Sequence, residues 1–228
     1  MTSAIQIRRA GRMAALLLLL QFILMWTAFF VLSSAINWPV SLDDPAAIAL
    51  PRVLAESASM MIGYGCYLMV GILLVPATAA LNVRLGLSGA LAGATLSLAT
   101  LAAMAKCIGI SRWLFAMPTL AEAYGAPGAD QAAIAVQFEM LNAWAGGIGE
   151  ILGVGLLSGV WTLLVAGAVF RLGGRGARVL AVFAFATGLI LLATIPAGFG
   201  VDLGPVLTVS GVLWQFALFG IAAWALTD

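Results

Sequence analysis

The chain has 228 residues, of which 64% are hydrophobic and 8% are charged, and its mean hydropathy is +1.14. A soluble domain has about a quarter of its residues charged, so this composition predicts a surface that mostly faces lipid. The net charge of +1 and the lack of any Lys/Arg-rich tract exclude a nucleic-acid partner.

Histidine is absent from the chain, and the only cysteines are Cys66 and Cys107. This excludes bis-histidine haem, HExxH zinc proteases, Ser-His and Cys-His dyads, and four-cysteine zinc or iron–sulfur sites. We therefore predict no metal ion, no cofactor and no catalytic residue. Both cysteines fall in apolar segments, which favours buried, unreactive thiols over a disulfide or a redox pair.

Six apolar segments are long enough to cross a bilayer, which takes about twenty residues in a helix. They span about 13–35, 53–80, 86–110, 132–170, 178–197 and 205–226. The first follows three arginines, as the apolar region of a signal peptide does. Its apolar run exceeds the usual ~7–15 residues of such a region, so we expect an uncleaved membrane helix. The pattern predicts an all-α, polytopic membrane bundle that forms one integral-membrane domain over residues 1–228.

The basic residues indicate the orientation of these segments. If the N-terminus is cytoplasmic, six crossings place seven of the ten basic residues on the inner side: Arg8, Arg9, Arg12, Arg84, Arg171, Arg175 and Arg178. This bias predicts that both termini are cytoplasmic. We expect a multi-pass protein of the bacterial inner membrane, in contact with the lipid bilayer.

Between the third and fourth segments, residues 111–131 have an amphipathic middle. Trp113, Met117, Leu120 and Tyr124 recur at helical spacing before "GAPGAD" ends the pattern. This favours an interfacial or re-entrant helix over a free loop.

Pairs of glycines recur at four-residue spacing within the apolar segments. They are Gly89/Gly93, Gly149/Gly153 and Gly155/Gly159. Such spacing indicates close helix packing, with a dedicated dimerisation motif as the alternative.

Four ionisable residues fall where the segments cannot easily place them in water: Glu56, Lys106, Glu139 and Glu150. A charge at the bilayer centre costs about 3 kcal/mol or more, so such residues usually face a cavity or the bundle interior. At 100° per residue, one stripe of the fourth helix holds Glu139, Asn142, Gly146, Glu150, Gly153 and Leu157. A stripe of the second helix holds Glu56, Ser59, Gly63 and Tyr67.

These stripes predict a polar pocket that opens to the outer side. Pairing of Lys106 or Arg112 with one of the three glutamates would make the charges tolerable there. The predicted ligand-binding residues are Glu56, Tyr67, Lys106, Arg112, Glu139, Asn142 and Glu150. The alternative is structural: charges near the outer end snorkel to water, and Glu150 is protonated because burial disfavours a charged carboxylate.

Two stretches resemble a known family: "RWLFAMPTLAEAYGAPGADQAA" and "GEILGVGLLSGVWTLLVAGAVFR". The likeness rests on Arg112, Leu120, Tyr124, Gly149, Glu150, Gly159, Trp161 and Arg171 and covers nearly the whole chain. The chain is similar to an uncharacterised bacterial family of six-helix membrane proteins, catalogued as a domain of unknown function. This resemblance implies an inner-membrane location and brings no activity and no functional residue.

Three functions are compatible with these features. We favour a non-catalytic membrane protein, in an accessory or sensor role, whose pocket takes a small amphiphile or a helix of a partner membrane subunit. The alternative is a small transporter or proton-coupled permease in which Glu150 cycles its proton. The third, an intramembrane enzyme that uses Glu150 and a bound ligand or metal, is disfavoured because no base is present to activate a serine.

Overall fold

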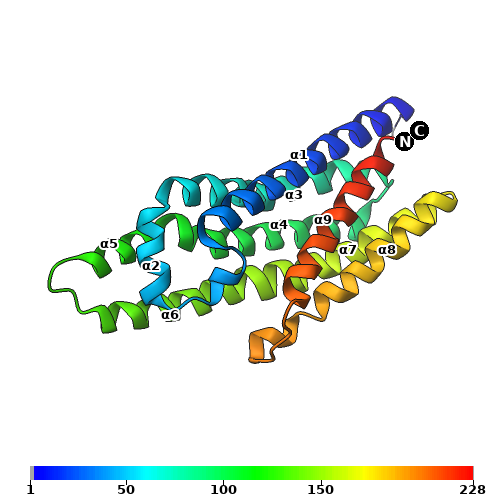
Figure 1. Ribbon diagram of the computed structural model, residues 1–228. Helices are drawn as coiled ribbons and strands as arrows, with labels where there is room; N and C mark the ends of the chain where they lie inside the picture. The colour runs from blue at the N-terminus through cyan, green and yellow to red at the C-terminus, as the bar shows by residue number, and fades with distance from the viewer. Residues whose placement is uncertain (1–2, 228) are drawn as a thin grey trace.

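The computed structural model describes residues 3–227, so residues 1, 2 and 228 of the expected domain lie outside the described residues. The described part is helical, and six helices are long and apolar enough to cross a membrane (Figure 1). They are α1 (Ala4–Ile36); α3 (Ser57–Arg84); α4 (Gly89–Ser111) continued by η2 (Arg112–Ala116) and α5 (Met117–Gly125); α6 (Gln131–Gly146) continued by η3 (Gly147–Ser158) and α7 (Gly159–Leu172); α8 (Arg175–Leu192) with η4 (Ile195–Phe199); and α9 (Val206–Ala225). The all-α, six-helix membrane architecture predicted from the sequence is confirmed.

The six long helices form a closed ring in the order of the chain. Each packs against its sequence neighbour, and α9 packs against both α8 and α1, which closes the ring. The two termini lie side by side at one end (Figure 1). We call the opposite end of the bundle, where the α5–α6 hairpin lies, the distal end.

Two short helices, η1 (Val40–Asp43) and α2 (Ala46–Ala55), connect α1 to α3. The sequence predicts that the second crossing begins at 53, but Val53 belongs to α2, where it is buried against α5 and α3. Glu56 interrupts the helix with backbone angles of φ −110° and ψ 24°. The chain bends there because α2 packs across α5 instead of continuing the axis of α3.

The amphipathic segment after residue 111 is helical, but it is not a separate element. It continues α4 through η2 and α5 as one helix of 37 residues, and α6–η3–α7 forms an antiparallel partner of 42 residues. At about 1.5 Å per residue both exceed the ~30 Å hydrocarbon core, so the α5–α6 hairpin extends beyond the other crossings (Figure 1).

The interior holds two hydrophobic cores. The proximal core, near the termini, takes side chains from all six long helices, including Leu18, Leu74, Trp161 and Leu218. The distal core is built from α1, α2, α3, α4, η2, α5 and α6. Neither α8 nor α9 contributes to the distal core, so α9 lies beside it rather than within it.

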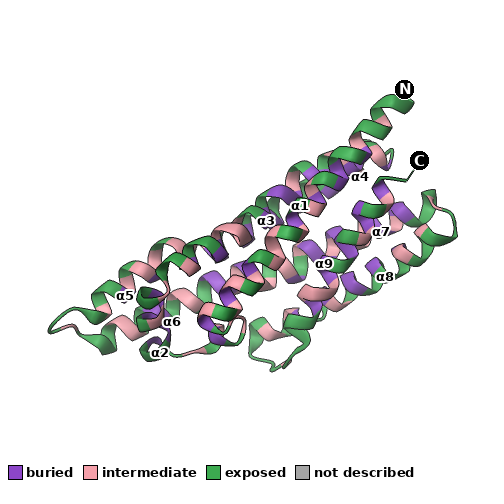
Figure 2. Ribbon diagram, turned by 45° about the horizontal axis from the view of Figure 1, so that its top comes forward, coloured by how far each residue is buried: buried purple, intermediate pink, exposed green. Residues whose placement is uncertain are grey.

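Exposed residues occupy the outer faces of the long helices (Figure 2), and many of them carry large apolar side chains. Large exposed examples are Ile23, Phe30, Met61, Met104, Val182 and Phe216. In water so many exposed apolar groups would be unfavourable, whereas lipid is a suitable solvent for them.

Glycines bring several of the helices into close contact. A Cβ on Gly109 would lie 2.7 Å from Cα of Gly149, so α4 and η3 cross with their backbones almost touching. An added Cβ would also meet neighbours at Gly153, Gly155 and Gly159, as close packing requires, but would meet nothing at Gly89 and Gly93. The predicted close packing therefore applies to the fourth crossing and not to the first glycine pair.

Candidate ligand-binding site

A cavity of about 160 Å³ lies in the distal half of the bundle. Its walls come from α1, the segment after α1, α3, α4, η2, η3, the turn between α8 and η4, and the first half of α9. The lining residues are Met25, Trp26, Phe29, Trp38, Pro39, Leu42, Tyr64, Tyr67, Lys106, Gly109, Ile110, Arg112, Trp113, Gly149, Glu150, Val154, Thr194, Leu207, Thr208, Ser210, Gly211, Val212 and Gln215. The space exists because α9 runs past the distal core without packing into it.

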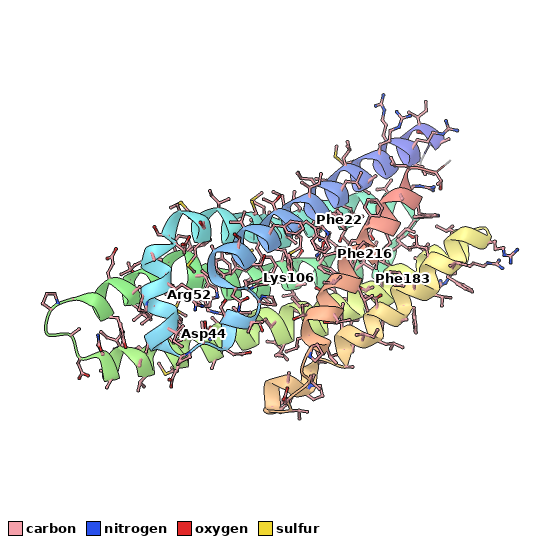
Figure 3. All side chains as sticks on the ribbon, in the orientation of Figure 1. Phe22, Asp44, Arg52, Lys106, Phe183 and Phe216 are labelled. Atoms are coloured by element: carbon pink, nitrogen blue, oxygen red, sulfur yellow. The ribbon has the colours of Figure 1, made fainter. Side chains whose placement is uncertain are left out.

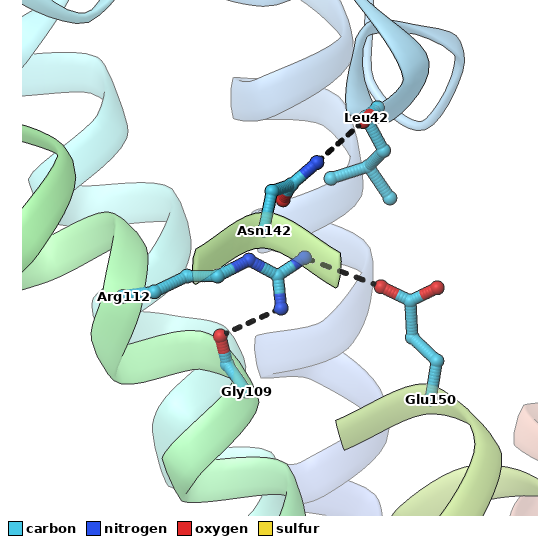
Figure 4. Close-up of polar contacts among 5 residues, drawn as sticks. All are labelled: Leu42, Gly109, Arg112, Asn142 and Glu150. Atoms are coloured by element: carbon cyan, nitrogen blue, oxygen red, sulfur yellow. Dashed lines mark hydrogen bonds and ion pairs between the residues drawn. The ribbon is translucent and has the colours of Figure 1, made fainter. Parts of the chain in front are cut away.

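Arg112 and Glu150 form an ion pair on one wall of the cavity (Figure 4). Nη2 of Arg112 lies 3.4 Å from Oε1 of Glu150, and Nη1 donates to the carbonyl oxygen of Gly109 at 3.0 Å. Only 5% of the Arg112 side chain is exposed, against 44% for Glu150. Arg112 is therefore fixed in the protein, while Glu150 presents its second carboxylate oxygen to open space.

The helix crossing explains why these two side chains meet. Gly109 and Gly149 are in near backbone contact, and each lies within one turn of its charged residue, Arg112 or Glu150. Gly146 leaves room for the guanidinium, because a Cβ there would lie 3.2 Å from Nη2 of Arg112. Small residues at the crossing thus set the distance between cation and carboxylate.

Glu150 lies in a long π-helical stretch, η3, that replaces the α-helix from Gly147 to Ser158. The hydrogen-bond pattern of the fourth crossing changes from α-helical to π-helical at Gly146-Gly147. The wider π turn rotates residues after 147 relative to those before it. Glu139 lies on α6 before this change and is exposed, whereas Glu150 lies within η3 and lines the cavity.

Lys106 is the second cation of the cavity and is 3% exposed. It lies in the interior of the bundle beside α9 (Figure 3), with Nζ 4.0 Å from the centroid of the Trp214 ring. Within residues 3–227, Nζ of Lys106 has no hydrogen-bond partner. Gly153 gives the lysine its space, since a Cβ there would lie 3.1 Å from its Cγ.

Aromatic rings form most of the remaining walls. Tyr64 and Trp113 are stacked, with centroids 5.4 Å apart and 2° between the planes, and Trp38 meets Tyr67 edge to face. The hydroxyl of Tyr64, the indole N–H of Trp26, Nε of Arg112 and Oε1 of Gln215 are buried without a hydrogen-bond partner in the described part of the chain. The cavity is thus apolar with several unused polar groups, as ligand sites commonly are.

Of the predicted binding residues, Tyr67, Lys106, Arg112 and Glu150 line the cavity. Asn142 lies next to it, donating through Nδ2 to the carbonyl oxygen of Leu42 at 3.1 Å (Figure 4). Glu56 is outside the lining and accepts a hydrogen bond from Ser59, and Glu139 is exposed on α6. The pairing predicted between a cation and a glutamate is found for Arg112 with Glu150; Lys106 has no acidic partner in the described residues.

Residues of α1 and α9 were not foreseen in this site. Trp26 and Phe29, and Ser210, Gly211 and Gln215, line the cavity from the first and last crossings. Gln215 and Trp26 carry polar groups within apolar segments. These two residues are the signal in the sequence by which the first and last crossings could have been assigned to the site. Their relation to Glu150 depends on closure of the ring, which no local pattern encodes.

Within residues 3–227, no group of three or more metal-ligating side chains comes together. Cys66 and Cys107 are both free and partly buried. The chemistry that this cavity offers is therefore hydrogen bonding and charge within apolar walls.

Comparison with known families now places the chain. A model described as Domain of unknown function (DUF4386) matches residues 13–226. The chain belongs to the DUF4386 family. The match covers nearly all of the chain, so the family resemblance seen in the sequence is confirmed. No curated protein and no solved structure matches this DUF4386 protein.

Proposed function

We propose that this DUF4386 protein is a non-catalytic binding protein of the bacterial inner membrane, in an accessory or sensor role, whose cavity takes a small amphiphile. Residues 1–228 act as one membrane domain, with both termini in the cytoplasm and the distal end outside. The Lys/Arg bias supports this orientation, because seven of the ten basic residues flank the crossings at the terminal end.

The observation that carries the proposal is the combination of lining groups. Aromatic rings surround the Arg112–Glu150 pair and the buried cation of Lys106, beside α-helices whose outer faces suit lipid. An amphiphile from the membrane would place its polar end among these charges and its apolar part against the rings. Such a ligand suits the cavity better than a partner helix, which needs a long exposed groove.

Transport by Glu150 receives less support. Below the cavity, Ser158 donates to the carbonyl oxygen of Gly153, and Thr162 donates to that of Ser158. The indole N–H of Trp214 also donates to the Thr162 hydroxyl, so this hydroxyl is both a donor and an acceptor within the bundle. A proton or solute pathway needs polar groups that are free to exchange hydrogen-bond partners. The hydroxyls of Ser158 and Thr162 already have partners within the protein.

Gly211 provides a direct test of binding in the cavity. It lines the cavity on α9, and a Cβ there would meet no atom within 4 Å. Gly211→Leu should therefore fill the space without disturbing the fold. Gly167→Leu on α7 is the matched control, because its added Cβ also meets nothing and the residue is not part of the lining.

Native mass spectrometry of the purified variants gives the readout. We expect a small-molecule adduct on the wild type and on Gly167→Leu, and its loss in Gly211→Leu. Glu150→Gln should change retention of the adduct, because it removes a carboxylate charge from the lining. A wild type without adduct, or an adduct equally retained by Gly211→Leu, would reject binding in this cavity.

A further inference from the structure

We infer that the amphiphile is an anion, a single alkyl chain ending in a phosphate or carboxylate, whose head group binds to Nζ of Lys106. This inference rests on the proposed function, since it names the class of ligand that the cavity takes. The balance of charge, the set of unused donors and the shape of the space support it.

The charged residues of the lining do not balance. Lys106 and Arg112 face a single acid, Glu150, which is already paired with Arg112. Lys106 therefore remains as a buried ammonium without an acidic partner in the described residues. Burying an uncompensated charge is costly, and an anionic head group would relieve that cost.

The hydrogen-bonding groups of the cavity are mainly donors. The ammonium of Lys106, Nε of Arg112 and the indole N–H of Trp26 are buried and unused, and the Tyr64 hydroxyl is a further donor. The one unused amide acceptor among them is Oε1 of Gln215. A site rich in donors matches phosphate or carboxylate oxygens, which only accept hydrogen bonds.

Trp214 does not replace such an anion. Its ring lies 4.0 Å from Nζ of Lys106 and attracts the cation, a contribution of about 0.5–2 kcal/mol. A ring face covers one side of an ammonium, however, and an ammonium has three N–H donors. The remaining N–H donors have no partner in the described residues and are available to a ligand in the cavity.

The shape of the cavity favours one alkyl chain. On the terminal side, α1 and α9 meet through Phe22 and Phe216, whose centroids are 6.0 Å apart (Figure 3). Further toward the distal end, Trp26, Leu207 and Gly211 line the cavity instead. A volume of about 160 Å³ resembles the ~150 Å³ that accommodates a benzene-sized molecule. It can take a head group and the first methylenes, with the rest of one chain along the apolar faces of α1 and α9.

Titration with amphiphiles of equal chain length tests the head-group class. The protein in phosphatidylcholine nanodiscs is titrated with dodecyl phosphate, laurate, dodecyltrimethylammonium and inorganic phosphate, below micelle-forming concentrations. Binding is followed by thermal shift and native mass spectrometry. We expect both anionic amphiphiles to bind at least tenfold more tightly than the cationic one, and inorganic phosphate to bind at least tenfold more weakly than dodecyl phosphate. Equal binding of inorganic phosphate would identify a free anion as the ligand and reject the amphiphile.

Lys106→Met separates an anchoring lysine from a structural one. Methionine keeps an unbranched apolar chain, so the ligand-free variant should melt at or above the wild-type temperature while its affinity for dodecyl phosphate falls at least tenfold. Lys106→Gln, which keeps a donor without the charge, should show the same loss. Unchanged affinity in either variant would overturn the inference and leave Lys106 as a cation held by Trp214.

The outcomes distinguish this inference from the proposed function. If dodecyltrimethylammonium binds as well as the anions, and Gly211→Leu blocks both, the cavity binds amphiphiles but the anionic assignment is wrong. If none of the probes binds more tightly to the wild type than to Gly211→Leu, the proposed function fails as well. The selectivity of the wild type decides the head group even where both Lys106 variants fail to fold.

Discussion

At the scale of single residues, Arg112 and Glu150 have unequal roles in the same ion pair. Arg112 is almost fully buried and also donates to the carbonyl oxygen of Gly109, whereas nearly half of the Glu150 side chain is exposed. Loss of the arginine removes two charge-assisted hydrogen bonds. Loss of the carboxylate charge weakens one long contact that is partly open to the cavity.

We therefore expect Arg112→Met to lower the free energy of unfolding by about 1.5–3 kcal/mol. Glu150→Gln keeps an oxygen that can accept from Nη2 of Arg112, so its cost should stay below about 1 kcal/mol. Thermal melting and SDS titration of the purified variants in a neutral detergent measure the difference. A larger loss in Glu150→Gln than in Arg112→Met would contradict this ranking.

At the scale of elements, the crossing of α4 with η3 positions the site. Gly109 and Gly149 allow the two backbones to touch, and η3 departs from α-helical hydrogen bonding over Gly147–Ser158. Ser158 donates to the carbonyl oxygen of Gly153, five residues earlier, which satisfies an acceptor within the π-helical stretch. The crossing therefore fixes both where Glu150 lies and which way it faces.

Gly109→Ala should disturb this crossing. Its Cβ would lie 2.7 Å from Cα of Gly149, and a backbone atom cannot move aside without separating the helices. We expect a loss of about 1–3 kcal/mol in stability, together with weaker binding in the cavity. Melting temperatures and the native mass spectrum report both effects.

Gly93→Ala is the matched control in the same helix. Its Cβ would meet no atom within 4 Å, and alanine is a better helix former than glycine by about 1 kcal/mol. This variant should melt at or above the wild-type temperature and keep its ligand. If it loses as much stability as Gly109→Ala, the close approach of α4 and η3 is not the cause.

At the scale of the whole molecule, ring closure by α9 against α1 and α8 creates the cavity. The distal core holds α1–α6 together without α9, so a space remains between that core and the last crossing. The same closure brings the two termini to one end of the bundle (Figure 1).

Orientation in the membrane can be tested with single-cysteine reporters. After replacement of Cys66 and Cys107 by alanine, Gly174→Cys lies in the turn between α7 and α8, and Ala126→Cys lies in the turn after α5. Both positions are exposed. In spheroplasts, a membrane-impermeant maleimide should label Ala126→Cys and spare Gly174→Cys until the cells are lysed. Labelling of Gly174→Cys in intact spheroplasts would reverse the predicted topology.

Local signals explain how much of this protein could be predicted from its sequence. An apolar run of twenty residues has few alternatives to a membrane helix, so six crossings follow from composition and segment length. The cost of a charge in lipid singles out Lys106 and Glu150, and it makes a partner for Glu150 expected. Glu56 and Glu139 satisfy the same criteria but lie outside the cavity lining: Glu56 interrupts the helix between α2 and α3, and Glu139 is exposed on α6.

The amino-acid sequence by itself determined that the outer surface faces lipid, how many helices cross the bilayer, and which few polar residues are costly to place in lipid. These properties depend on the free energy of transferring each residue into the bilayer, which is largely local. The tertiary structure alone decided that Arg112 meets Glu150, that Lys106 has no acidic partner among residues 3–227, and that α1 and α9 supply walls to the cavity. Those facts depend on which helix faces touch once the ring closes, and contacts between residues far apart in the chain carry no pattern within any one segment.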